Sequence, residues 1–266
     1  MRLYCQIMLN AVQSGTTYRF HTFITTANRL VALLVQFFLW TALYAGASAL
    51  SVPITQVSLD EMITYAVFST MISMIVANEN IETLSQKIQT GNIVTYLIRP
   101  IGLFRSLLFE TLGTKAFAAL FEIIPILVVG YLFFSPAELP LSHLLGFLIA
   151  LFNGFMVYFL LTFLVGMSSF WYLRIFHLSF VLTHLINFFS GIVIPIWFFP
   201  KALYAVTSWL PFDLIYYHPL AILLGKADES QTLFAFAKGA AWIAVLAAAS
   251  AIAWMAAKRK VVVQGG

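Results

Sequence analysis

Apolar runs of membrane-spanning length dominate this sequence of 266 residues. Hydrophobic residues make up 62% of the chain and charged residues only 9%, whereas soluble chains are about 25% charged. Because about 20 apolar residues cross a bilayer as a helix, the runs predict an all-α polytopic membrane protein with six transmembrane helices. The six runs lie at 30–50, 57–77 (or 62–77), 116–134 with Pro125 inside it, 143–168, 178–199 and 239–257.

The distribution of basic residues predicts the topology. Six spans place both termini on one side, which then holds eleven of the fourteen Lys and Arg residues. The other side holds Lys201, Lys226 and Lys238. The positive-inside rule therefore predicts cytoplasmic termini, and an odd number of spans would remove this asymmetry. The net charge of +4 reflects these bases and does not indicate nucleic acid binding.

This topology divides the chain into three parts. Residues 1–29 are expected to be a cytoplasmic amphipathic segment, 30–257 the transmembrane domain and 258–266 a cytoplasmic tail. Within the first part, an apolar stripe beside scattered arginines predicts a helix, or a pair of helices, lying on the anionic inner leaflet. A loosely ordered cytoplasmic tail is the alternative.

A polar stretch at 78–92 interrupts the apolar runs, in a cytoplasmic loop expected to extend from 78 to 115. Ile81, Leu84 and Ile88 recur at the spacing of one helix face, and Gly91 is a typical helix stop. A short helix of this kind either docks on a partner, through its apolar stripe and its charges, or lies at the membrane surface without a partner. We favour docking.

The segment 200–231 is too apolar for a solvated loop, and prolines divide it into pieces too short to span a membrane. It predicts two short helices, at 202–210 and 214–224, that re-enter the outer leaflet. Irregular backbone at that depth must be covered by protein or face water. Asp213 lies between the two pieces and is predicted to cap the second helix.

Two stretches resemble the membrane subunit of type-2 ATP-binding-cassette (ABC) exporters. One is GNIVTYLIRP at 91–100, and the other is FFSGIVIPIWFFPKALYAVTSWLPFDLIYYHPLAILLGK at 188–226. The second stretch has the family's pattern in Ser190-Gly191, Pro195, Phe199-Pro200, Leu210-Pro211-Phe212 and Tyr217-His218-Pro219. By topology the resemblance covers nearly the whole chain, with an inner amphipathic helix, six spans, a cytoplasmic coupling helix between spans two and three, and outer re-entrant helices between spans five and six.

The resemblance implies a permease that depends on a separate ATPase subunit. The coupling helix would be 78–90, ended by Gly91, with Glu79, Glu82, Gln86 and Lys87 at the ATPase. ATP and Mg would bind to that partner, and this chain would bind no cofactor and act as no enzyme itself. A second permease, identical or related, would complete an export path. Lipid, antibiotic, peptide and glycoconjugate substrates all remain open.

The chain itself has no phosphate-binding loop, because Gly225-Lys226-Ala227 lacks both the earlier Gly and the Ser or Thr. No metal site is expected either. Cys5 is the only cysteine, and the five His residues have no metal-ligand spacing.

Three polar residues inside apolar runs are candidates for a functional role. Glu122 would lie about 9 Å inside the third span, where a carboxylate is either functional or paired, here with Lys115. His184 and Asn187 of the fifth span would line a path or pair across helices. In the sixth span, a small-residue face formed by Ala244, Ala247, Ala248 and Ala251 is expected to pack within the subunit or the dimer.

Two other functions compete with an ABC permease. A secondary transporter driven by an ion gradient predicts paired midplane acids and an internal repeat, and the sequence has neither. A membrane scaffold or an intramembrane enzyme is the second alternative, but no catalytic spacing of Ser, His or Asp supports an enzyme.

Overall fold

The computed structural model describes residues 2–17, 19–45, 49–51, 56–98, 102–134, 141–172 and 174–261. Its elements, in chain order, are α1 (Arg2–Thr17), α2 (Arg19–Leu43), β1 (Ala49–Ser51), β2 (Gln56–Ser58), α3 (Leu59–Val76), α4 (Asn80–Gln89), α5 (Thr95–Ile98), α6 (Leu103–Phe121), α7 (Ile123–Phe134), α8 (Leu144–Met167), α9 (Phe176–Phe189), α10 (Lys201–Trp209), α11 (Tyr217–Leu223) and α12 (Glu229–Val261). Short 3₁₀ turns lie between several of these helices.

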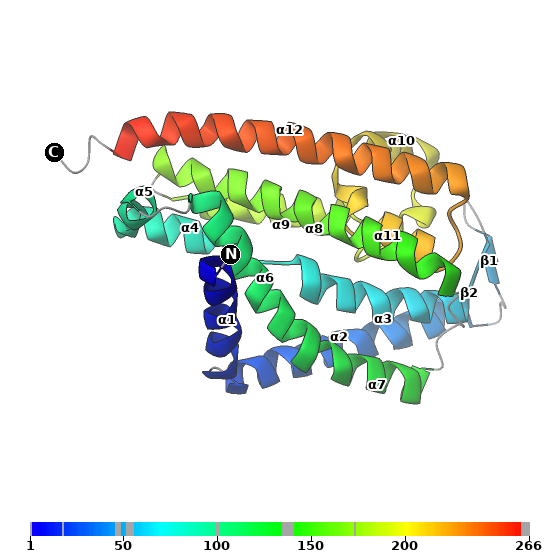
Figure 1. Cartoon of the computed structure of the whole chain (residues 1–266). Helices are drawn as coiled ribbons and strands as arrows, with labels where there is room; N and C mark the ends of the chain where they lie inside the picture. The colour runs from blue at the N-terminus through cyan, green and yellow to red at the C-terminus, as the bar shows by residue number, and fades with distance from the viewer. Residues whose placement is uncertain are drawn as a thin grey trace.

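The long helices lie side by side in one bundle (Figure 1). At one end of the bundle lie α4, α5 and the last turns of α12, and α1 runs across the bundle there. We call this the α4 end. The β1–β2 hairpin and α10 lie at the opposite end, which we call the hairpin end. The segments expected to be cytoplasmic therefore share one end of the molecule.

Helix α2 ends at Leu43, seven residues before the expected end of the first span at 50. The reason is that Ala49–Ser51 forms β1, which pairs antiparallel with β2. Ser58 and Glu61 then form a reciprocal capping box at the start of α3. Helix α1 packs on α6, where a Cβ atom on Gly113 would lie 2.8 Å from the Ala11 Cβ.

The third apolar run is longer than predicted, because α6 begins at Leu103 rather than near 116. The helix breaks at Glu122, which separates α6 from α7. Pro125, in the first turn of α7, explains this break, because a proline clashes with the carbonyl four residues before it, that of Phe121. The predicted interruption is thus present, three residues before the proline.

Helix α8 packs against α3, α4, α11 and α12. Phe159, Leu160 and Met167 are fully buried along it. Two glycines permit close approach: a Cβ on Gly154 would lie 2.8 Å from the Leu214 carbonyl oxygen, and one on Gly166 would lie 3.1 Å from the Leu84 Cβ. The bounds of α8 agree with the predicted span at 143–168.

The fifth apolar run does not form the helix expected at 178–199. Helix α9 has 14 residues and ends at Phe189, with Ser190 as its C-cap, and Gly191 then adopts a left-handed φ of 85°. Pro195 then begins a 3₁₀ turn at Ile196–Phe198. Within the segment 200–231 lie α10 and α11, near the two short helices expected at 202–210 and 214–224. Helix α12 begins at Glu229, ten residues before the expected start of the sixth span.

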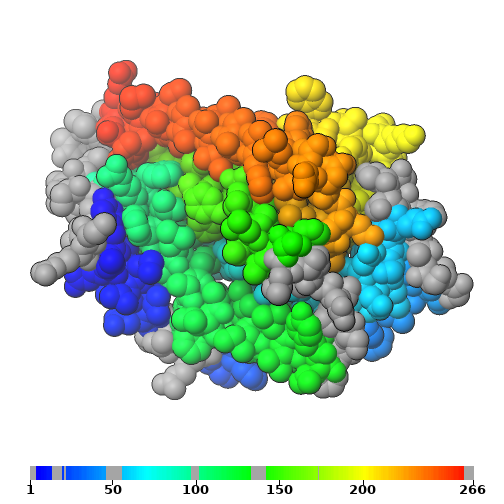
Figure 2. All heavy atoms as spheres, turned by 45° about the vertical axis from the view of Figure 1, so that its right-hand side comes forward, coloured from blue at the N-terminus to red at the C-terminus, as the bar shows by residue number. Residues whose placement is uncertain are grey.

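Among the described residues, five segments are long and apolar enough to cross a membrane, and α9 is a shorter apolar helix. The five are Thr22–Leu43, Leu59–Gln89, Leu103–Leu132, Leu144–Phe170 and Glu229–Lys260. Figure 2 shows α12 at the surface along the upper edge of the molecule. The exposed apolar side chains of this helix include Ile252 and Met255. The alanine face predicted to pack is exposed in this chain. The fold is that of an all-α polytopic membrane protein.

Candidate functional site

The polar helix α4 turns its apolar stripe inward. Ile81 and Leu84 are buried, and the helix packs on α8 at Gly166. Gly91, with a φ of 75°, follows the end of α4 at Gln89, as expected of a helix stop. The expectation that this stripe would fill a groove in a partner is wrong, because α8 of the same chain already covers it.

The opposite face of α4 carries the exposed polar groups. Glu79, Glu82 and Gln86 are exposed on it, spaced three and four residues apart. Lys87 was predicted to join them, but it is half-buried and forms an ion pair of 2.9 Å with Glu110 of α6. The exposed surface of α4 is therefore acidic and polar, without Lys87.

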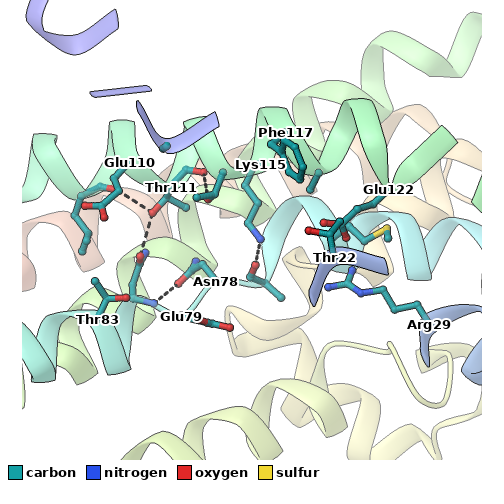
Figure 3. A pocket seen from close by; sticks show the side chains of 17 residues that line it. Thr22, Arg29, Asn78, Glu79, Thr83, Glu110, Thr111, Lys115, Phe117 and Glu122 are labelled. Atoms are coloured by element: carbon teal, nitrogen blue, oxygen red, sulfur yellow. Dashed lines mark hydrogen bonds between the residues drawn. The ribbon is translucent and has the colours of Figure 1, made fainter. Parts of the chain in front are cut away.

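The corner between α3 and α4, residues 77–80, is hydrogen-bonded to α6 (Figure 3). Lys115 Nζ donates to the main-chain carbonyl of Ala77. Thr111 Oγ1 donates to Asn80 Oδ1 at 3.0 Å. The ion pair between Lys115 and Glu122 that the spacing suggested is absent from the salt bridges of the described residues.

The same corner and α4 are also bonded to α8 and α9. Thr162 Oγ1 of α8 donates to Asn78 Oδ1 at 3.0 Å. Ser179 Oγ of α9 donates to Glu82 Oε1 at 2.7 Å. Side-chain hydrogen bonds thus join this polar segment to α6, α8 and α9. Sequence reasoning missed all of these partners, since a lone Thr or Ser in an apolar run carries no signal of its own.

Toward the hairpin end, the Ser-Gly and proline pattern packs into one aromatic cluster. Tyr65 of α3 donates its hydroxyl to the Gly191 carbonyl at 2.7 Å. The buried Trp197 ring lies 5.3 Å from that of Tyr65 and 5.8 Å from that of Tyr217. The prolines punctuate this segment: Pro195 and Pro211 are buried at the starts of turns, Pro200 precedes α10, and Pro219 lies in the first turn of α11.

Asp213 has a different role from the cap predicted for it. The N-cap of α11 is Tyr216, which makes no side-chain capping bond. The Asp213 carboxylate instead accepts two hydrogen bonds from Lys238 Nζ of α12, at 2.6 and 2.7 Å. His218 Nε2 lies 3.3 Å from the same carboxylate. Only 5% of the Asp213 side chain and 7% of the Lys238 side chain are exposed, so this is a buried ion pair.

His184 and Asn187 lie on the exposed face of α9. They line a shallow apolar cavity of about 190 Å³ together with Phe188 and Phe199. His184 Nδ1 lies 2.8 Å from the Phe180 carbonyl, within its own helix. These two residues therefore face outward from the bundle.

Glu122 lines a larger cavity, of about 510 Å³, between α1, α2, α4 and α6. Arg29, Glu79 and Lys115 also line it. The sequence singled out Glu122 and Lys115 but gave no reason to place Arg29 of α2 beside them (Figure 3).

Five apolar segments of spanning length, and a polar helix bonded to them, define a multi-pass membrane protein. The sequence model of a family described as "ABC-2 family transporter protein" matches residues 30–265, and the chain belongs to this family. It is a type-2 ABC permease subunit, the membrane component of a transporter. Neither a curated protein nor a solved structure matches the chain.

Proposed function

We propose that this permease exports its substrate using ATP bound by separate ATPase subunits, and that α4 is the helix on which the ATPase docks. ATP and Mg bind to that partner, while this chain supplies the path through the membrane. Two permeases, identical or related, assemble with two ATPases in a prokaryotic plasma membrane. Six crossings, with α9 and the turns that follow it as the fifth, keep both termini and α4 in the cytoplasm.

The observation that carries this proposal is the pair of contrasting faces on α4. A helix whose apolar face is covered and whose acidic face is exposed presents a rigid polar surface at the end of a membrane bundle. Charges on such a surface direct association and fix its register more than they add affinity. The exposed Glu79, Glu82 and Gln86 match that role.

The hydrogen bonds of the 77–80 corner and of Glu82 in α4 supply a route for coupling. When ATP closes the ATPase pair, the docked helix moves with its partner. The bonds to Lys115, Thr162 and Ser179 carry that displacement into α6, α8 and α9. Helices α2, α3 and α9 then rearrange so that a path between two permeases opens outward. The re-entrant helices α10 and α11 cover the outer end of this path.

A charge reversal on the exposed face tests the docking role. Glu82→Lys should weaken ATPase association about tenfold, because it replaces an attractive rim charge by a repulsive one. The measurement is recovery of the ATPase with the tagged chain from detergent-solubilised native membranes, together with ATP-dependent export in vesicles. ATPase association and export unchanged from wild type would contradict the docking role.

Glu82 also accepts a bond from Ser179, so a matched control is needed. Ser179→Ala removes that internal bond and leaves the exposed charge in place. We expect Ser179→Ala to retain the ATPase. If it instead loses the ATPase as fully as Glu82→Lys, the internal bond is the cause and the charged surface is not.

A gradient-driven carrier predicts a different result. A well-folded chain that is recovered alone, and that transports without ATP when an ion gradient is imposed, would replace the ABC exporter by that alternative. Recovery of an ATPase, with ATP hydrolysis that requires both proteins, favours the exporter.

A further inference from the structure

The cavity of about 510 Å³ near the α4 end contains charges of both signs (Figure 3). Its basic residues are Arg29 and Lys115, and its acidic residues are Glu79, Glu110 and Glu122. Lys87, outside the cavity, pairs with Glu110 and neutralises it. Two bases and two acids therefore remain, and the salt bridges among the described residues include none between them.

Two buried donors in this cavity have no hydrogen-bond partner within the described structure. They are Nη1 of Arg29 and Nδ2 of Asn80. Asn80 is only 5% exposed, and its Oδ1 is already bonded to Thr111, which fixes the amide with its NH₂ group left over. Buried donors in proteins are nearly always satisfied. These two donors thus lack an acceptor, and an anionic one would suit the Arg29 guanidinium best.

Exposed apolar side chains flank the cavity. Phe23 and Ile24 follow Thr22, a lining residue of α2. Phe121 and Ile124 lie on either side of Glu122 along α6 and α7, and both are exposed. A ligand with a polar head and hydrocarbon chains would fit both surfaces at once. The volume is within the range of small-ligand sites, roughly 300–1,000 Å³.

We propose that this cavity binds the phosphoethanolamine headgroup of a phospholipid. The phosphodiester oxygens accept from Arg29 and Asn80, with Lys115 as the nearby second cation. The ammonium group donates to Glu122 and Glu79. A purely anionic headgroup would satisfy the donors but would meet the two carboxylates, whereas a headgroup of both signs pairs with all four charges.

This inference does not depend on ATPase coupling; only the assignment of the lipid to the inner leaflet rests on the topology proposed above. A failure of lipid binding would leave the ATPase pull-down unaffected, and the reverse also holds.

Native mass spectrometry of the full chain in detergent tests the proposal. The probes are phosphatidylethanolamine, phosphatidylglycerol with the same acyl chains, and soluble glycerophosphoethanolamine. We expect one phosphatidylethanolamine bound per chain and about tenfold weaker binding in Arg29→Gln. Asn80→Asp should weaken binding to a similar extent, because it keeps the oxygen that accepts from Thr111 but removes the amide donor. Arg105→Gln is the matched control, because Arg105 is an exposed base on α6 that does not line the cavity.

Each outcome decides the proposal. Equal binding of phosphatidylglycerol and phosphatidylethanolamine would overturn it. Equal binding of phosphatidylethanolamine by Arg29→Gln and by wild type would also overturn it, because the lipid would then be held only around the helix bundle. If glycerophosphoethanolamine binds but phosphatidylethanolamine is not retained, the ligand is a soluble phosphoester, and the proposal of a phospholipid ligand is overturned. Arg29→Lys keeps the charge and should keep binding, which separates loss of the ligand from loss of the fold.

Discussion

Removing one member of the buried ion pair between Asp213 and Lys238 should be among the most destabilising single changes at the hairpin end. Lys238→Met would leave the Asp213 carboxylate 5% exposed, with only His218 at 3.3 Å as a partner. Breaking a buried pair by removing one member costs about 3–5 kcal/mol, and His218 keeps the loss near the lower value. At about 2–4 °C per kcal/mol for a large chain, the midpoint of thermal unfolding should fall by about 10 °C.

Removal of both charges should recover most of this loss. In the double variant Asp213→Asn with Lys238→Met, no charge is left buried, and neutral replacements of buried pairs are often close to neutral in stability. A double-mutant cycle should give a coupling free energy of at least about 2 kcal/mol, because Asp213→Asn alone leaves Lys238 buried without its carboxylate. The assay is loss of the monodisperse peak after heating in detergent, at one fixed heating time, because membrane chains unfold irreversibly under such conditions.

Lys201→Met is the control, since Lys201 is an exposed base in the same segment of the chain. It should leave the midpoint unchanged. The reasoning is refuted if Lys238→Met lowers the midpoint by less than about 2 °C, or if the double variant is less stable than the single one.

Two further changes test other contacts. Gly166→Val should destabilise the protein by about 1–3 kcal/mol and weaken ATPase recovery, because the new methyl groups would collide with Leu84 and displace α4. Thermal unfolding measures the first effect and the pull-down measures the second. Wild-type values in both assays would contradict the packing of α4 on α8. At the start of α12, the pKa of Asp228 is lowered from its usual value of 3.8, because the backbone amide of Gln231 and the hydroxyl of Ser230 donate to the ionised carboxylate. The stabilisation is complete above the usual pKa and is lost as the pH falls through the lower pKa of the folded state. Asp228→Ala should therefore lower the midpoint of thermal unfolding at pH about 7 but not at pH about 2. An equal effect at both pH values would exclude a cap that depends on the charge.

Hydropathy was enough to predict the class of fold, because a bilayer demands long apolar helices. Helix ends were predicted less well. Leu43 ends α2 because the next residues enter a hairpin, and Glu229 starts α12 because Asp228 caps it, ten residues before the apolar run begins. Local capping and strand pairing decided these ends, and hydropathy windows do not detect either.

The candidate site was predicted in outline only. The stripe of Ile81 and Leu84 gave α4 and its orientation but not the identity of its cover, which is α8. Lys238 was counted as an outer loop charge, whereas it lies in α12 and pairs with Asp213. Pairings of this kind join residues distant in the sequence, and one sequence contains no information on which helices meet.

The exposed polar residues of α4 and its buried apolar stripe lie on opposite sides of the helix, so the polar residues can change without repacking the stripe. Substitutions at Glu79, Glu82 and Gln86 alter the surface on which we propose that the ATPase docks, but leave Leu84 seated against Gly166. Permeases of this design can therefore diverge in their choice of ATPase while the bundle stays constant. Exchanging these three side chains for those of a second permease should change which ATPase binds. Such exchanges would need no compensating substitution in α8.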